Sequence, residues 1–174
     1  MKFYPLDKLL KMIEGSNKKL CISLLEKNTE RFYLSPGSRS KHQNWKGGYV
    51  DHLEETMSMA VNFYKLMFKV RKPDFSLSDA LFVLFLHDLE KPFKYIEPKI
   101  IKSKDRNLDK DFVTKMLIQE NIKLSKAQLN AFAYIHGEGE DYHPTKRIQN
   151  PVGAFCHMCD NASARIWFDY PKRG

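Results

Sequence analysis

The chain is poor in cysteine and contains no long apolar run. Its 174 residues include three cysteines, and no apolar segment approaches the roughly 20 residues needed to span a bilayer. Residues 1–8 contain no uninterrupted apolar segment of signal-peptide length. These absences argue against a membrane-spanning protein, and we expect a soluble, cytoplasmic one.

The single CxxC motif, Cys156 and Cys159, also lacks the partners that would give it a function. A structural zinc site needs four ligands, and the sequence has no second CxxC. A redox CxxC normally follows a strand in a βαβ pattern, which this sequence does not show. We therefore expect the two thiols to pack as small apolar side chains on a helix.

Strand-like alternation, internal repeats and low-complexity segments are absent too, and helical periodicity dominates. Apolar residues make up 43% of the chain, enough for a real core, and the length suggests one domain over residues 1–174. The expected fold is a compact, single-domain, all-α fold. The helices are expected at residues 5–14, 17–27, 49–70, about 76–88, 109–120, 125–136 and 151–167. Residues 30–34 are expected to be extended or irregular, and residues 35–48, 95–108 and 137–150 to be loops.

Positive charge is in excess. The net charge is +8 and the pI is about 9.3. This balance favours anionic partners such as phosphates, nucleotides or nucleic acid, although solubility alone explains it equally well.

The pair His87–Asp88 is the most informative feature of the sequence. It closes the apolar run of residues 80–86, where an unpaired imidazole or carboxylate would lose several kcal/mol of hydration. A divalent cation would offset that loss. His52, His136 and Asp160 could complete such a site. Imidazole and carboxylate ligands suit Mn, Fe, Co, Ni, Zn or, less readily, Mg.

The segments around these residues share their order and their flanks with a known pattern. GGYVDHLEET around His52 resembles the helix start GGLLxHxLxV, and LFLHDLEKP around His87 and Asp88 resembles LLHDIGK. YIHGE around His136 resembles SHHG, and HMCDNASA around Asp160 resembles ADxLSA. Over residues 47–165 the chain therefore resembles the HD superfamily of metal-dependent phosphohydrolases.

The resemblance implies a helical HD-domain fold in which His52, His87, Asp88 and Asp160 hold a divalent metal ion. It also implies hydrolysis of a phosphate ester or anhydride, most often in nucleotides or nucleic acids. Binuclear members carry additional histidines between the HD pair and the last aspartate, and none lies between Asp88 and His136 here. A second metal is therefore disfavoured, although His136 could serve one. Glu90 stands where the pattern often has glycine. It could add an acidic group near the metal, or it could be an ordinary solvated charge.

Two further residues are candidates for the chemistry beside the catalytic ligand Asp88. Lys91 could neutralise a substrate phosphate, or it could be a cation favoured at a helix C-terminus. His136 could act as a general acid, an oxyanion donor or a second-metal ligand, or it could pack. Two other histidines are weaker candidates. His157 could form a hydrogen bond to a metal ligand, and His143 could take part in catalysis.

Basic and aromatic side chains in two loops could bind the substrate. Arg39, Lys41 and Trp45, with His42, could form a base-stacking and phosphate-binding rim, and Lys146 and Arg147 are similar candidates. The alternative is that both segments are ordinary basic loops. Arg165 lies five residues after Asp160, so we expect it to face away from the metal.

Three functions compete at this stage. The first is a phosphohydrolase acting on a nucleotide: a nucleotidase, a deoxynucleoside triphosphate hydrolase or a cyclic-nucleotide phosphodiesterase. The second is a 3′–5′ exonuclease on single-stranded RNA or DNA, favoured by the basic charge and the Trp45 loop. The third is a non-catalytic nucleotide-binding module, which the intact ligand set disfavours.

Overall fold

The computed structural model describes residues 2–96 and 106–169, with the side chains of residues 106–112 left out. No strand occurs in this part of the chain, so the expected all-α fold is confirmed. The α-helices are α1 (Leu6–Lys11), α2 (Gly15–Lys27), α3 (Thr29–Leu34), α4 (Gly48–Val70), α5 (Leu77–Leu86), α6 (Lys91–Ile96), α7 (Arg106–Gln119), α8 (Lys126–Tyr134) and α9 (Pro151–Ile166). A short 3₁₀ turn, η1, spans Gly139–Asp141.

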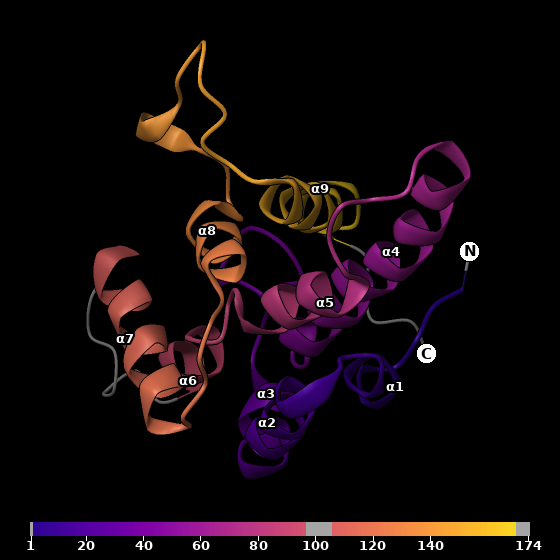
Figure 1. Ribbon diagram of the computed structural model, residues 1–174. Coiled ribbons are helices and arrows are strands. Elements are labelled where there is room, and N and C mark those ends of the chain that lie inside the picture. The colour runs from indigo at the N-terminus through magenta and orange to yellow at the C-terminus, as the bar shows by residue number, and fades with distance from the viewer. Residues whose placement is uncertain (1, 97–105, 170–174) are drawn as a thin grey trace.

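Three helices form the centre of the molecule (Figure 1). α4, α5 and α9 pack against one another, α8 packs on α9 and α5, and α1 and α3 pack on α4. α5 is buried on every side from Ala80 to Leu86, as expected of a helix that is apolar all round. The start of α4, the end of α5 and an inner turn of α9 meet at one place, and the candidate site lies there.

Capping residues fix where the helices of the site begin. Ser76 caps α5, and its hydroxyl accepts a hydrogen bond from the amide of Asp79 at 3.0 Å. The side chain of Asn150 caps α9 at 2.7 Å from the amide of Gly153, and Pro151 occupies the first turn. The expected helix starts at about residue 76 and at residue 151 are therefore confirmed.

Two expectations for local structure were wrong. Thr29–Leu34 is helical, because the fully buried ring of Phe32 packs against Tyr49 and Phe85 and this contact favours a helical turn. The expected loop over residues 95–108 is helical at both ends, in α6 and α7, while residues 97–105 lie outside the described residues. Pro92 occupies the first turn of α6, where its missing amide hydrogen would have no helical partner.

None of the helices in the described residues has the length and apolar character to cross a membrane. The thiols of Cys156 and Cys159 are free and buried on α9, as expected. Burial raises the pKa of both thiols. The two groups therefore remain protonated and pack as apolar side chains.

Candidate metal centre

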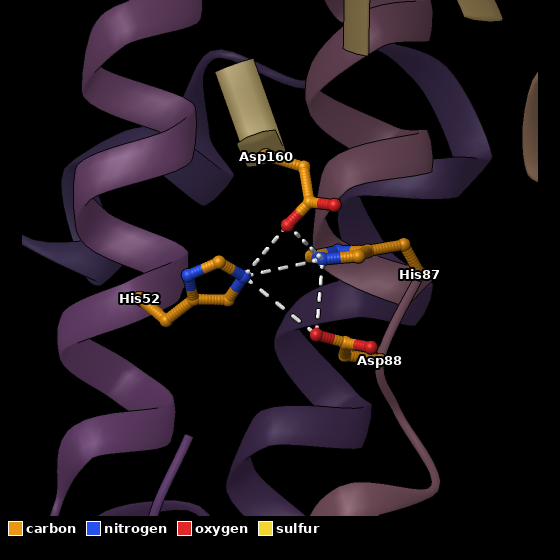
Figure 2. Close-up of side chains that lie close together, drawn as sticks. All are labelled: His52, His87, Asp88 and Asp160. Atoms are coloured by element: carbon orange, nitrogen blue, oxygen red, sulfur yellow. Dashed lines mark hydrogen bonds and ion pairs between the residues drawn. The ribbon is translucent and has the colours of Figure 1, made fainter. Parts of the chain in front are cut away.

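Four side chains from the central helices converge at one point (Figure 2). His52 lies near the start of α4, His87 and Asp88 follow α5, and Asp160 lies within α9. All four residues are buried, and one ligand atom from each lies within 4.8 Å of all the others. The four ligands expected from the sequence are therefore brought together.

The distances within this cluster match those around a bound ion. His52 Nε2 lies 3.4 Å from His87 Nε2 and 3.1 Å from Asp160 Oδ1. His87 Nε2 lies 3.1 Å from Asp88 Oδ2 and 3.5 Å from Asp160 Oδ1. Ligands bound to one first-row metal at roughly 2.0–2.3 Å are about 2.8 to 3.8 Å apart along the edges of an octahedron or tetrahedron. The cluster therefore has the dimensions of a coordination shell.

Hydrogen bonds on the outer side of each imidazole fix its orientation. The Nδ1–H of His87 donates to the carbonyl of Leu84 at 2.6 Å. His52 Nδ1 lies 2.9 Å from the hydroxyl of Ser163, and that hydroxyl donates to Glu55 at 2.7 Å. The serine oxygen must therefore accept from His52. Both rings thus turn Nε2 toward the cluster, the usual arrangement for metal-binding histidines.

The charges in the cluster are strongly coupled. Burial opposes a charge on His87, but the carboxylates of Asp88 and Asp160 outweigh it and raise its pKa to about 10. Burial lowers the pKa of His52. The pKa of Asp160 is held well below its usual range, because its contacts with the imidazoles of His136, His52 and His87 outweigh burial. In the metal-free protein a proton on His87 therefore supplies part of the positive charge that a metal ion would bring.

Asp88 shows most directly that the cluster fits a cation. Its Oδ2 atom is buried and receives no well-oriented hydrogen bond. Around it lie the Nε2 atoms of His52 and His87, and the ammonium of Lys91 forms an ion pair with it. An anionic oxygen buried in this way is stable only beside positive charge. The donor set of two imidazoles and two carboxylates therefore could hold a divalent metal ion.

His136 lies at the edge of this cluster rather than in the core. Its Nδ1 is 3.1 Å from Asp160 Oδ2, and its Nε2 is 3.8 Å from Asp88 Oδ1. Its side chain remains 55% exposed. The ring therefore contacts a ligand carboxylate while staying accessible to a molecule in the pocket.

A pocket of about 880 Å³ opens from the cluster to the surface. Both cationic and apolar side chains line it, together with the acids of the cluster. The cations are Lys41, Lys91, Lys94 and Arg165. The apolar and aromatic residues are Tyr95, Val113, Phe132, Ile135, Ala164 and Phe168. The pocket therefore combines positive charge with apolar surface.

The five expected substrate-binding residues differ in how close they lie to the pocket. Lys41 lines the pocket, and the guanidinium of Arg39 lies 5.6 Å from the centre of the Tyr95 ring, which also lines it. Trp45 is not among the lining residues, since its indole N–H donates to Asp51 at 2.7 Å. Lys146 and Arg147 are exposed in the loop before α9 and do not line the pocket either.

The remaining candidates are placed as follows. Lys91 begins α6 and is almost buried beside Asp88, so the expected alternative of a helix C-terminal cation does not describe it. Glu90 lines the pocket. Arg165, which we expected to face away from the metal, lines it too, because the pocket extends along α9 beyond Asp160. His157 lines the pocket as well, and its Nδ1–H donates to the carbonyl of Ile135. His143 is exposed and contacts Thr145.

Three residues of the site were missed by the sequence analysis: Gln43, Glu55 and Ser163. Glu55 and Ser163 each lie three residues after a ligand, His52 and Asp160, on the same helix face. A search one helical turn beyond each ligand would have found them. Gln43 lies in an irregular loop, and no local pattern marks it.

Comparisons with known proteins give no match. No family model, no curated protein and no solved structure matches the chain.

Proposed function

We propose that this protein is a metal-dependent phosphohydrolase of the HD type that acts on a nucleotide. The observation that carries the proposal is the convergence of His52, His87, Asp88 and Asp160 at the inner end of a cationic pocket. The resemblance of the segments around these four residues to the HD pattern supports the same conclusion.

The chemistry follows from the donor set. A divalent ion held by two imidazoles and two carboxylates would retain open positions, where it acidifies water and polarises a phosphoryl oxygen. The residues of the chain would bind and orient that ion: Leu84 and Ser163 hold the two imidazoles through their Nδ1 atoms, which leaves each Nε2 to face it. Because these outer contacts are already made, little reorganisation is needed on binding.

Lys91 and His136 are proposed to act on the substrate. The ammonium of Lys91 is beside Asp88 and lines the pocket, where it would bind a phosphoryl oxygen through a charge-assisted hydrogen bond. The ring of His136 contacts Asp160 and is accessible, so it would donate a proton to the leaving oxygen. Binding and protonation would thus come from different sides of the same cluster.

The pocket itself favours a nucleotide over a longer nucleic acid. Its volume of about 880 Å³ is that of a typical small-molecule site. The apolar wall formed by Val113, Phe132 and Ile135 suits a base, and Lys94 and Arg165 suit phosphates. The exonuclease and the non-catalytic module are kept as outcomes of the test.

The test is a hydrolysis screen of metal-free protein resupplied with Mn²⁺, Mg²⁺, Co²⁺ or Zn²⁺. Nucleoside mono-, di- and triphosphates, cyclic nucleotides and short oligonucleotides are offered, and products are identified by mass. We expect release of phosphate or pyrophosphate from a mononucleotide. Degradation of oligonucleotides alone would support the exonuclease, and binding without hydrolysis would support the non-catalytic module.

The matched variant for this screen is Asp88→Ala. It removes a ligand, so hydrolysis should fall to background. Loss of a residue that only hydrogen-bonds a ligand lowers metal affinity by roughly 10–100-fold, and we expect the Mn²⁺ affinity of Asp88→Ala to fall by more than that. Asp141→Ala removes an exposed carboxylate and should leave both unchanged. Circular dichroism verifies that Asp88→Ala remains helical. Wild-type turnover in that variant would reject the proposed role of Asp88.

A further inference from the structure

His42 lines the pocket beside the metal ligands, and its ring is part of a series of imidazole contacts. The ring centres of His42 and His52 are 4.9 Å apart, those of His52 and His87 are 5.4 Å apart, and those of His87 and His136 are 5.8 Å apart. The two inner rings belong to the candidate metal ligands. His42 and His136 therefore flank the cluster from the two ends of this series.

Gln43 fixes the orientation of His42. The carboxylate of Glu55 can only accept hydrogen bonds, so the amide nitrogen of Gln43, 2.8 Å away, must face it. The carbonyl oxygen of Gln43 therefore faces His42, and it lies 2.6 Å from Nδ1. Because this oxygen can only accept, His42 must carry its hydrogen on Nδ1.

The opposite nitrogen of His42 is left as an acceptor. Within the described residues, Nε2 has no hydrogen-bond partner, and the residue lines the pocket. The ammonium of Lys91 lines the same pocket. A neutral imidazole with its hydrogen on Nδ1 offers a lone pair at Nε2. The same ammonium disfavours a second metal ion at this position.

The backbone of Gln43 is held in place unusually firmly. Gln43 is fully buried and has a φ of +41°, a left-handed value uncommon for a residue with a side chain. Its amide donates to the carbonyl of Phe168 at 2.8 Å, and its carbonyl accepts from Gly37 and Trp45, both at 2.9 Å. Its side chain also contacts the hydroxyl of Ser163 at 3.2 Å, which in turn holds His52. One buried amide thus orients both His42 and a metal ligand.

We infer that Gln43 is a positioning residue that presents His42 Nε2 as the hydrogen-bond acceptor for the attacking water. This inference rests on the proposed phosphohydrolase function. Entering and leaving oxygens lie roughly in line across the phosphorus during phosphoryl transfer, which suits groups that flank the metal from two ends. His42 serves the entering oxygen, and His136 serves the leaving oxygen.

The reaction balances without any further reactant. The oxygen of water forms a bond to phosphorus while the bond from phosphorus to the leaving oxygen breaks, and its electron pair stays on that oxygen. His136 donates a proton to the leaving oxygen and regains one from solvent. The water proton passes to bulk solvent through the open pocket, and His42 orients the water through its lone pair.

The first test measures the ring hydrogens directly. Metal-free protein with ¹⁵N-labelled histidine is examined by long-range ¹H–¹⁵N correlation at neutral pH, with His42 assigned by its absence in His42→Phe. We expect the Nδ1–H tautomer in the wild type and its loss in Gln43→Leu. Gln128→Leu removes another buried glutamine, one that contacts Asp79 away from the pocket, and should leave His42 unchanged. An Nε2–H tautomer in the wild type would overturn the inference.

The second test uses His42→Phe, which keeps an aromatic ring against His52 but has no acceptor. We expect kcat to fall by about 10²-fold, as for a misplaced reacting group, with KM and Mn²⁺ affinity close to wild type. His143→Phe is the control on the surface. Wild-type turnover would reduce His42 to packing, and lost Mn²⁺ affinity would make it a ligand; both overturn the inference.

Gln43→Leu should reproduce the loss of turnover, and Gln43→Met, which has similar length but no oxygen to accept from His42, provides a second variant if the first does not fold. A wild-type protein that hydrolyses nothing would overturn the proposed function together with the role assigned to the water. The tautomer measurement would then still decide whether Gln43 presents His42 Nε2 to the pocket. The two failures are therefore distinguishable.

Discussion

At the scale of single residues, the site separates groups that bind a metal from groups that act on a substrate. His52 and His87 are buried, and their outer nitrogens are already occupied. His136 is more than half exposed and contacts a ligand carboxylate from the pocket side. This difference in exposure is the physical reason to assign it a separate role.

Replacing His136 tests that role. We expect His136→Ala to lower turnover by about 10²-fold or more, a loss of general-acid size, while metal content is retained. His136→Gln should recover part of the substrate binding but not the proton transfer. Turnover is measured from about pH 5 to 9 for both variants, with metal content determined in parallel. Unchanged rates would assign His136 to packing, and loss of metal would make it a ligand and revive the binuclear interpretation.

The pH dependence of metal binding follows from His87. In the metal-free protein its pKa is raised to about 10 by Asp88 and Asp160, although burial opposes the charge. Below that pH a metal ion must displace one proton, so the apparent affinity should rise about tenfold for each pH unit. Mn²⁺ titration calorimetry in buffers of different ionisation enthalpy should detect the released proton. Affinity independent of pH would show that His87 is already unprotonated.

At the scale of elements, the start of α4 determines where His52 lies. Gly47 has a φ of +82°, which ends the preceding loop, and a β-carbon on Gly48 would collide with the carbonyl oxygen of Gln43. The loop that carries His42 and Gln43 is therefore packed directly on the first turn of the helix that carries His52. Any backbone shift at this contact changes both parts of the site.

We expect Gly48→Ala to lower the free energy of unfolding by about 3 kcal/mol, at the upper end for overpacking, because backbone must move. It should also weaken Mn²⁺ binding. Gly139→Ala is the control: Gly139 has a φ of +55° but open space around it, so the loss should be only about 1–2 kcal/mol. Urea unfolding and Mn²⁺ titration measure the two effects. Equal losses in both variants would show that the close approach is not tight.

The sequence predicts those elements whose signal is local. The apolar run before His87, the cap at Ser76 and the proline at residue 151 each mark a helix end correctly. The helix at Thr29–Leu34 was missed because Phe32 is buried by distant residues rather than by a pattern of its own. The four ligands were found because each lies within or directly after a recognisable helix, in a segment that resembles the HD pattern.

The part of the site that the sequence does not predict depends on long-range contacts. Gln43 reaches Ser163, 120 residues away in the chain, and nothing near either residue indicates the pairing. Arg165 was excluded from its angle on an ideal helix, but a wide pocket brings its long side chain to the wall. Local periodicity therefore identifies ligands more readily than the residues that orient them.

At the scale of the whole molecule, the net charge of +8 does not by itself choose between a nucleotide and a nucleic acid. What matters is where the cations lie. Lys41, Lys94 and Arg165 line the pocket, whereas Lys146 and Arg147 are exposed outside it. A nucleotide uses the first group only, and a long single strand would use both.

The salt dependence of binding distinguishes these cases. For single strands, the logarithm of the affinity falls with the logarithm of salt concentration with a slope of about −0.7 per neutralised phosphate. A pocket that neutralises about two phosphates should give a slope near −1.4 for a hydrolysis-resistant phosphorothioate oligonucleotide. Lys94→Ala should make the slope shallower, and the paired change of Lys146 and Arg147 to alanine should leave it unchanged. A slope near −4 or steeper that depends on Lys146 and Arg147 would instead support the exonuclease, because a strand would then extend beyond the pocket.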